Sequence, residues 1–394
     1  MPKSERLGSR VTQLAWALLA VGVGAGAVCL IGGIGRAGAL ERAYLQAVTY
    51  FLGLSLGSLS LLMVAHLVRG AWGELCRRVW EAAAALSPLF VILLAPVFVD
   101  LSTIYPWADP AAVNEMEPRF AAKVEEKEGY FASWFFWLRA AGVLAAVTAL
   151  SWLLVRWSTL EDRSRELTWQ RRMRVLSGPG LFVLTVVLTF AATDWWKSLD
   201  PAWYSTMYPV LFLVGFAVGA LALAILVVVL LGRKEMPLAH YLTPLRYGHL
   251  GTMLLALLML WLYVNFGQYL ITWSGDLPDK IQWFIPRART SWKWVAAALL
   301  LLHFAVPFLI LLPKANRRNP GLLAALAIGV LLLRAVDLHW LLAPSFHPEG
   351  ASLHWLDIAA FVAVGGLWAA LFVWRLSAYP VLPRVRYVLE EREP

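Results

Sequence analysis

The chain has 394 residues, of which 60% are hydrophobic and only 15% are charged. Soluble domains carry about 25% charged residues, so this composition excludes an ordinary soluble protein and indicates an all-α polytopic membrane protein. The net charge of +9 is explained below by its distribution around the membrane, so no nucleic-acid partner is expected. The two cysteines, Cys29 and Cys76, are too few for an iron–sulphur cluster, which needs about four thiolates.

Ten stretches are long and apolar enough to cross a bilayer, which takes about 20 residues per helix. In chain order they cover residues 12–34, 44–68, 80–104, 131–155, 177–196, 205–231, 247–272, 292–312, 320–341 and 353–375. The first follows a short basic segment without a small-residue cleavage site, so we expect a retained helix and not a signal peptide.

The loop at 105–130, between the third and fourth stretches, is the only sizeable hydrophilic loop, and it is mainly acidic. We expect either a solvated loop, with at most one short helix, or a docking surface for a basic partner.

The basic residues are unevenly distributed across the membrane. Of the 34, 22 lie at the two termini and in the loops near 69–78, 156–174, 232–246 and 313–319. Ten lie in the opposite loops, and the remaining two, Arg139 and Arg334, lie inside helices. The positive-inside rule therefore predicts that both termini are cytoplasmic.

Ionisable residues inside the predicted spans are candidates for a proton-translocation route, because each is costly in a bilayer unless it is paired or hydrated. The outer half is predicted to hold Asp100, Arg139, Asp194, Arg334, Asp337, His339, His354 and Asp357. The inner half is predicted to hold His66, Glu81 and His249, and His303 lies near the middle of the eighth span.

Two pairs of residues in the outer half share a spacing of three. Arg334 and Asp337 are three residues apart, so they lie on one helix face and can pair there. His354 and Asp357 repeat the spacing on the next helix. Together the four predict either an ion-pair network that holds the last two helices together or a water-accessible exit for protons.

The inner pair, His66 and Glu81, suits a proton entrance, because small environmental shifts move histidine across neutral pH. The alternative is an ordinary surface pair between Glu81 and one of Arg69, Arg77 or Arg78. The chain contains no Gly-rich phosphate loop and no HExxH, GxSxG or CxxC motif. We therefore expect no catalytic residue, no metal ligand and no cofactor bound by this chain.

The segment from Asp194 to Pro209, with the sequence DWWKSLDPAWYSTMYP, connects the fifth and sixth predicted spans. Its three tryptophans and two tyrosines are typical of the aromatic belt that anchors helix ends at headgroup depth. The segment resembles a signature of a membrane subunit of alternative complex III, a quinol:cytochrome c oxidoreductase. That kind of subunit is similar to the NrfD-like family of polysulphide-reductase membrane subunits.

Three further segments agree with this resemblance in order. They are His66 to Trp72 with Arg77, Arg78 and Glu81; Phe266 to Trp273 with Leu277 and Pro278; and Pro344 to His347 with His354 to Asp357 and Gly365-Gly366. Lys197 departs from the pattern, because it stands where an apolar residue is expected and adds a charge at the outer rim.

The resemblance implies two four-helix bundles, at residues 44–197 and 198–341, flanked by single helices within 1–43 and 342–394. It implies a bacterial inner membrane and four kinds of partner: a homologous quinol-binding membrane subunit, an iron–sulphur protein, multihaem cytochrome c subunits and a terminal oxidase. Haem c and iron–sulphur clusters would belong to those partners, and quinol would be the substrate of the complex. This chain would provide scaffold and a proton route without being catalytic alone.

Two alternatives stay open. The chain could bind quinone directly, near the outer face, at a site bounded by Asp194, Trp195, Trp203 and His354, which offer a proton acceptor and an apolar slot. It could also be a secondary transporter, for which inverted repeats and broken helices are expected. Prolines do fall within two apolar stretches, at 96 and 307, but no internal repeat is evident.

Overall fold

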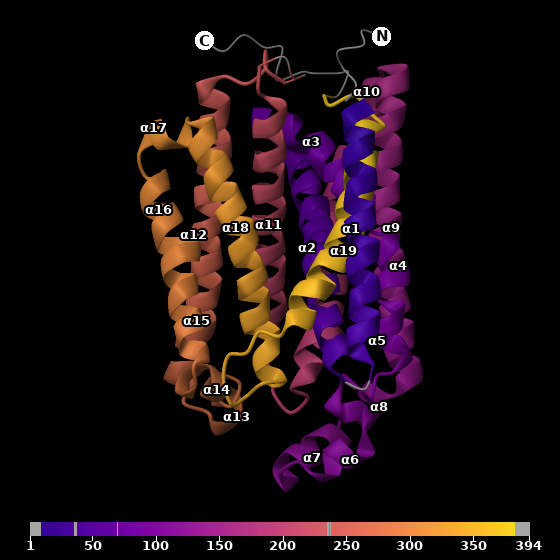
Figure 1. The fold of residues 1–394 in the computed structure, drawn as a ribbon, viewed down its shortest axis with the longest axis vertical. Helices are drawn as coiled ribbons and strands as arrows, with labels where there is room; N and C mark the ends of the chain where they lie inside the picture. Colours follow the sequence, from indigo (N-terminus) through magenta and orange to yellow (C-terminus); the bar gives the residue numbers. More distant parts are fainter. Residues whose placement is uncertain (1–8, 35–37, 69, 235, 237, 383–394) are drawn as a thin grey trace.

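The computed structural model describes residues 9–34, 38–68, 70–234, 236 and 238–382. Among these residues there is no strand, and ten helical spans are long and apolar enough to cross a membrane. The prediction of an all-α polytopic membrane protein is therefore confirmed. Figure 1 shows the spans standing side by side, with the start of α1 and the end of α19 at the same edge. We call this edge the terminal face and the opposite edge the loop face.

The spans are built from the long helices and their short continuations. They are α1 (Ser9–Gly33), α2 (Ala39–Val68), α3 (Ala71–Ala84) with α4 (Leu89–Leu93) and α5 (Ala95–Val99), α9 (Ser133–Ser164), α10 (Leu167–Ala191), α11 (Tyr208–Leu231), α12 (Pro244–Gly275), α15 (Trp292–Ala298) with α16 (Val306–Leu311), α18 (Pro320–Leu342) and α19 (Trp355–Ser377). The short helices between spans are α6 (Pro110–Asn114), α7 (Pro118–Glu125), α8 (Glu128–Phe131), α13 (Pro278–Ile281), α14 (Phe284–Arg289) and α17 (Lys314–Arg317).

Helices α2 and α11 form the centre of the molecule. Helix α2 packs on α3, α10, α11 and α19, while α11 packs on α12 and α18, and α1 lies along α19. At the crossing of α2 and α11, a Cβ on Gly57 would lie 2.1 Å from the backbone oxygen of Phe216. The two backbones therefore touch, an approach that small residues permit in membrane helices. The predicted boundaries of the two bundles stay a prediction.

Three spans extend further toward the terminal face than hydropathy predicts. The third begins at Ala71, the fourth ends at Ser164 and the fifth begins at Leu167. The loop predicted at 156–174 is reduced to Arg165 and Glu166, with Arg165 in the left-handed conformation at φ 59°. Arg77 and Arg78 at these ends pair with Glu161 and Asp162 across helices, so the helices continue through residues that a hydropathy window counts as loop.

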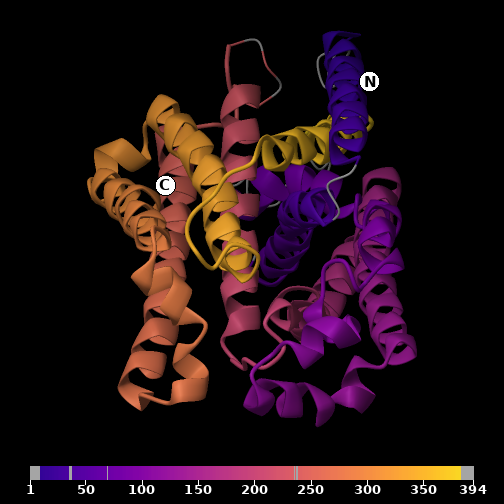
Figure 2. The same cartoon turned by 60° about the horizontal axis from the view of Figure 1, so that its bottom comes forward.

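The acidic loop at 105–130 holds three short helices where at most one was expected. Helices α6, α7 and α8 form an arm on the loop face, and Figure 2 shows it, in purple, on the face that also bears α13 and α14, in orange. Helices α6 and α7 each begin with a proline, and the Asp109 side chain caps α6 by accepting from the Ala111 backbone N–H at 3.0 Å.

The third, fifth and eighth spans are irregular, and in the fifth α10 continues into a π-helical segment, Ala192–Trp196. The third span breaks between α3 and α4, where a turn at residues 85–88 contains Pro88. The eighth span contains a π-helical segment, Leu299–Ala305, directly before α16 and Pro307. Such π-helical segments are rare and frequently mark functional sites.

Candidate functional site

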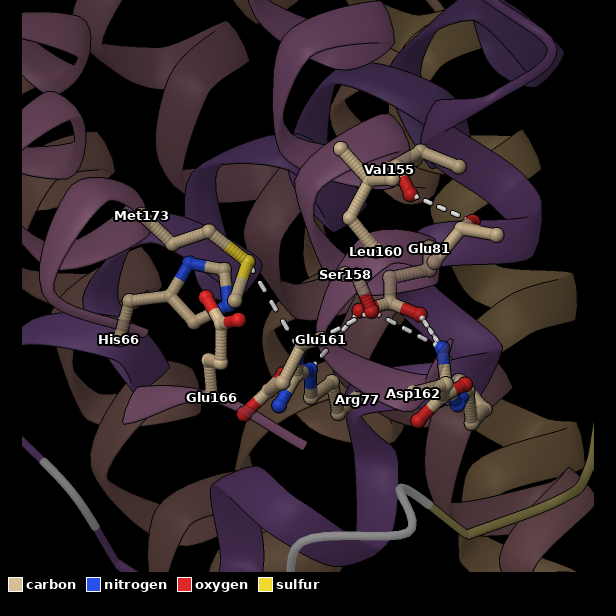
Figure 3. Close-up of polar contacts among 12 residues, drawn as sticks. His66, Arg77, Glu81, Val155, Ser158, Leu160, Glu161, Asp162, Glu166 and Met173 are labelled. Carbon is tan, nitrogen blue, oxygen red and sulfur yellow. Dashed lines mark hydrogen bonds and ion pairs between the residues drawn. The ribbon is translucent and has the colours of Figure 1, made fainter. Parts of the chain in front are cut away.

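A buried ionic cluster joins α3 to α9 near the terminal face (Figure 3). Its members are Arg77, Arg78, Glu81, Ser158, Glu161 and Asp162. The Glu81 carboxylate lies between two guanidinium groups, with Arg77 Nε at 2.8 Å and Arg78 Nη1 at 2.6 Å. Arg77 also pairs with Glu161, and Arg78 with Asp162. The side chains in these four ion pairs are only 1–9% exposed, so the protein shields the pairs from lipid.

Helical spacing explains how the cluster forms. Residues 77, 78 and 81 share one face of α3, and residues 158, 161 and 162 share one face of α9, because positions three and four apart are neighbours on a helix. The Ser158 hydroxyl accepts from Arg77 and from Arg78, each at 2.9 Å. Glu81 thus pairs with both Arg77 and Arg78, and the pairs are buried, where the sequence predicted a surface pair with one arginine. Arg69, the third predicted partner, lies outside the described residues.

Sequence reasoning missed Glu161 and Asp162, because the fourth span was predicted to end at residue 155. The signal was present as the 158/161/162 spacing, which continues the buried face of α9 through Leu154. One oxygen of Glu161, Oε1, is buried and accepts no hydrogen bond from any described residue. That oxygen therefore has an unused lone pair beside the ion pair to Arg77.

His66 lies beside the cluster, in the last turn of α2 (Figure 3). Its Nδ1 is 3.3 Å from the Ser177 hydroxyl, and Ser177 donates to the Met173 carbonyl at 2.7 Å. Met173 Sδ in turn lies 3.7 Å from Arg77 Nη2. The other ring nitrogen, Nε2, is buried without a hydrogen-bond partner among the described residues. The structure therefore places His66 near the cluster, on the side of α10, and not in contact with Glu81.

A second ion pair, near the loop face, joins the fourth and fifth spans. Arg139 Nε donates to Asp194 Oδ2 at 2.6 Å, and Nη2 donates to Oδ1 at 3.2 Å. The Tyr130 hydroxyl donates to Oδ1 at 2.7 Å, and the guanidinium lies 3.9 Å from the centroid of the Tyr130 ring. Burial and the hydrogen bond to Asp194 raise the pKa of Tyr130. Asp194 lies in a π-helical segment, Ala192–Trp196, that extends α10.

The tryptophans of the Asp194–Pro209 segment pack inside the protein, and not in the aromatic belt that the sequence predicted. Trp195 and Trp196 are each 1% exposed, and Trp203 is 4% exposed. Trp196 donates to the Thr49 hydroxyl at 2.9 Å and stacks on Phe212 at 4.2 Å between ring centroids. The segment therefore anchors helices to one another.

The same segment is tied to α13 and α14 and to the last loop-face connection. Trp203 stacks on Trp283 at 5.0 Å and donates to the Lys280 carbonyl at 3.1 Å. The Ser345 hydroxyl donates to the Asp200 carboxylate at 2.7 Å. Burial raises the pKa of Asp200, an effect that nearby Arg287 and the Ser345 hydrogen bond oppose.

A third ion pair lies deeper, between Arg334 and Asp337 on α18. Trp261 on α12 donates to Asp337 Oδ2 at 3.0 Å, and its ring meets His303 edge-on at 4.6 Å. His303 lies in the π-helical segment of the eighth span, is fully buried, and has no hydrogen-bond partner on either ring nitrogen among the described residues. A Cβ on Gly215 would lie 2.2 Å from the guanidinium, so glycine makes room for the Arg334 side chain.

The sequence predicted a network that joins Arg334 and Asp337 to His354 and Asp357. Among the described residues, this prediction was wrong. His354 and Asp357 form a capping box at the start of α19: the Asp357 carboxylate accepts from the His354 backbone N–H at 2.8 Å. His339 bonds Gln46 Oε1 through Nδ1 at 2.7 Å and the Ser352 carbonyl through Nε2 at 3.0 Å. The histidines of this region therefore link loops and helix ends.

The other two proton-route candidates, Asp100 and His249, are exposed. Asp100 accepts from the hydroxyls of Ser102 and Thr103 at 2.6 and 2.5 Å, and these hydrogen bonds lower the pKa of its carboxyl. It therefore organises the turn after α5. His249 lies in the first turns of α12, at the terminal face.

The residues predicted to bind quinone do not converge through any contact that the structure describes. Asp194 is bound to Arg139 and Tyr130, and His354 caps α19. An apolar cavity of about 390 Å³ does lie close to His354, between α2, α15, α18 and α19. Its lining includes Gln46, Tyr50, His339, Leu353, Asp357 and Phe361.

These features define a multi-pass helical membrane protein with ion pairs buried between its spans. No protein-family model matches the chain, and no curated protein matches it. Among the described residues, no three His, Cys, Asp or Glu side chains are grouped so that they could hold a metal ion.

Proposed function

We propose that this chain is a membrane subunit of a respiratory quinol:cytochrome c, or other high-potential acceptor, oxidoreductase. It would act with a homologous quinol-binding subunit, an iron–sulphur protein and multihaem cytochrome c subunits, and contribute scaffold and a proton route. The observation that carries the proposal is the set of ionic groups buried at three depths. A purely hydrophobic anchor would have no need of charges that are costly in a bilayer.

Buried acceptor atoms with no hydrogen-bond partner among the described residues support the route. Glu161 Oε1 and His66 Nε2 lie near the terminal face, and His303 lies deep in the eighth span. Asp337 and Asp194 follow toward the loop face, each beside an arginine. Protonatable groups at successive depths are the parts from which proton relays in membrane proteins are built.

Purification of the tagged chain from its native membrane tests the complex. We expect it to co-purify in mild detergent with haem c proteins, which haem-stained gels would show. The purified material should also catalyse quinol-dependent reduction of cytochrome c. Recovery of the chain alone, or without haem and quinol activity, from membranes that retain both would refute the proposal.

Proton release per electron in liposomes that contain the purified complex tests the route. We expect Glu81→Gln and Asp337→Asn to lower this ratio while haem content stays normal, and the exposed Asp100→Asn variant to leave it unchanged. Normal coupling in both buried variants would remove the proton route and leave a scaffold.

Direct quinone binding is the second candidate, and the apolar cavity beside His339 favours it. His339 Nδ1 holds the Gln46 side-chain oxygen, so the Gln46 amide nitrogen would donate to a ring oxygen while apolar side chains accept the ring. A photoreactive quinone analogue should then label this chain, and His339→Leu should lower the labelling. Labelling confined to another subunit of the complex would retire this candidate.

A further inference from the structure

A second cavity, of about 370 Å³, opens near the terminal face between α9, α19 and the break in the third span. Its lining includes Trp152, Arg156, Thr159, Arg163, Arg375 and Tyr379. Three cationic side chains therefore share one cavity, and none of them belongs to the ionic cluster.

The three arginines are arranged around one opening. Arg156 and Arg163 are seven residues apart on α9, which places them two turns, or about 10 Å, apart along one face. Arg375 reaches the cavity from the last turn of α19. Its guanidinium lies 5.1 Å from the centroid of the Tyr379 ring, and that of Arg156 lies 4.9 Å from the Trp152 ring.

No described residue brings a negative charge into this cavity. Its lining contains no aspartate or glutamate, and none of the three arginines forms a salt bridge with a described residue. The buried Arg77, Arg139 and Arg334 are all paired. The cavity therefore offers guanidinium groups, which bind phosphate oxygens in bidentate geometry, to an anion from outside the chain.

Besides the arginines, Ser151, Thr159 and Tyr379 are polar, and the rest of the lining is apolar. Ala85, Pro88, Val155 and Leu160 form the wall, and Trp152 is 54% exposed beside it. The apolar run of the fourth span ends at residue 155, and Arg156 and Arg163 follow it on α9. A basic rim above an apolar wall matches a phospholipid, with its phosphate at the arginines and an acyl chain along the wall.

We propose that this cavity binds an anionic phospholipid, whose phosphate contacts Arg156, Arg163 and Arg375. A small neighbouring cavity shares Thr159, Arg375 and Tyr379 with the first and reaches Arg78 and Glu81. The bound lipid therefore covers the side of the ionic cluster that faces this cavity. This site does not depend on the proposed role in respiration.

Lipid retention by the full chain, or by its complex, tests the site. The protein is purified in mild detergent, incubated with phosphatidylglycerol or with phosphatidylcholine, and the retained lipid is measured by native mass spectrometry. We expect phosphatidylglycerol to be preferred. A triple Arg156→Gln, Arg163→Gln, Arg375→Gln variant should bind it about a hundredfold more weakly, from about fivefold per arginine near a membrane surface.

The matched control removes three arginines from the same face but from another helix. Arg171, Arg172 and Arg174 are exposed at the start of α10, and their glutamine variant should retain lipid normally. Equal losses in the two triple variants would show general surface attraction and overturn the site. If the cavity triple variant does not fold, the single Arg163→Glu change, at an exposed position, should still lower retention severalfold, and unchanged retention would overturn the site.

The source of the phosphate is tested by competition. Inorganic phosphate at millimolar concentration should displace little phosphatidylglycerol, because it lacks an acyl chain for the apolar wall. Full displacement by inorganic phosphate, or equal retention of phosphatidylcholine, would refute a site for anionic lipid.

Discussion

Replacing Asp194 with asparagine tests whether a buried charge pair holds the fourth and fifth spans together. The change keeps the shape of the side chain and removes its charge, so the Arg139 guanidinium stays buried without a counter-ion. Asp194 is 2% exposed and Arg139 is 9% exposed, so water offers little compensation.

The expected loss follows from that burial. Removing one partner of a buried ion pair costs about 3–5 kcal/mol, because the remaining charge is uncompensated. Replacing both partners with apolar residues, Arg139→Met with Asp194→Leu, leaves no charge and should cost less than about 2 kcal/mol. The double-mutant cycle consists of the wild type, Arg139→Met, Asp194→Leu and the two changes combined. Each single change should cost about 3–5 kcal/mol, so the coupling energy should be above about 4 kcal/mol. An average interhelical hydrogen bond in a membrane protein gives about 0.6 kcal/mol.

The assay is unfolding of the purified protein by SDS in mixed micelles, followed by circular dichroism and tryptophan fluorescence. All four members of the cycle are measured at one lipid-to-detergent ratio, and gel filtration confirms that each starts folded. A coupling energy near about 0.6 kcal/mol would refute the argument from buried charge. Tyr130→Phe, which removes one hydrogen bond to the carboxylate, should cost about 1.5–3 kcal/mol in the same assay.

Three further predictions concern other parts of the fold. Gly57→Ala should destabilise the protein by about 1–3 kcal/mol, because the added methyl overpacks the α2–α11 crossing. Gly142→Ala should stabilise it by about 0.5–1 kcal/mol, because a Cβ there would meet nothing within 4 Å. Equal effects of the two variants in the unfolding assay would contradict the close crossing. Lys123→Ala should cost less than about 1 kcal/mol of stability, because the side chains of Lys123 and Asp279 are 31% and 48% exposed in their ion pair. A larger loss that persists at high salt would be inconsistent with a surface pair. The folded pKa of Asp200 is raised above its ordinary 3.8, so the folded state binds this proton more tightly than the unfolded state. The contribution of Asp200 to stability is therefore fully present below about pH 4 and is lost as the pH rises through the raised value. Asp200→Asn should flatten that part of the stability curve, and an unchanged slope would count against this assignment.

The sequence predicted the helical class and all ten spans, because apolar length is a local property that a bilayer demands of each helix separately. It also singled out Glu81, Asp194 and Asp337, because a charge in an apolar run is visible without a structure. The orientation of the chain, its membrane and its partners stay predictions.

The sequence erred where charged residues continue a helix. Glu161 and Asp162 were assigned to a loop, because a hydropathy window cannot know that Arg77 and Arg78 meet them from another helix. The His354–Asp357 spacing indicated a link between helices, but the same spacing also suits a cap, and the structure forms the cap.

The sequence by itself thus determined how many times the chain can cross a bilayer and which residues are costly to keep there. Only the tertiary structure decided how each cost is met across helices: Asp194 by Arg139 and Tyr130, and the guanidinium groups of Arg77 and Arg78 by Glu161 and Asp162. It also left His303 buried with no hydrogen-bond partner among the described residues. The physical reason is that hydropathy belongs to a single segment, whereas the pairing of buried charges depends on which helix faces lie against one another.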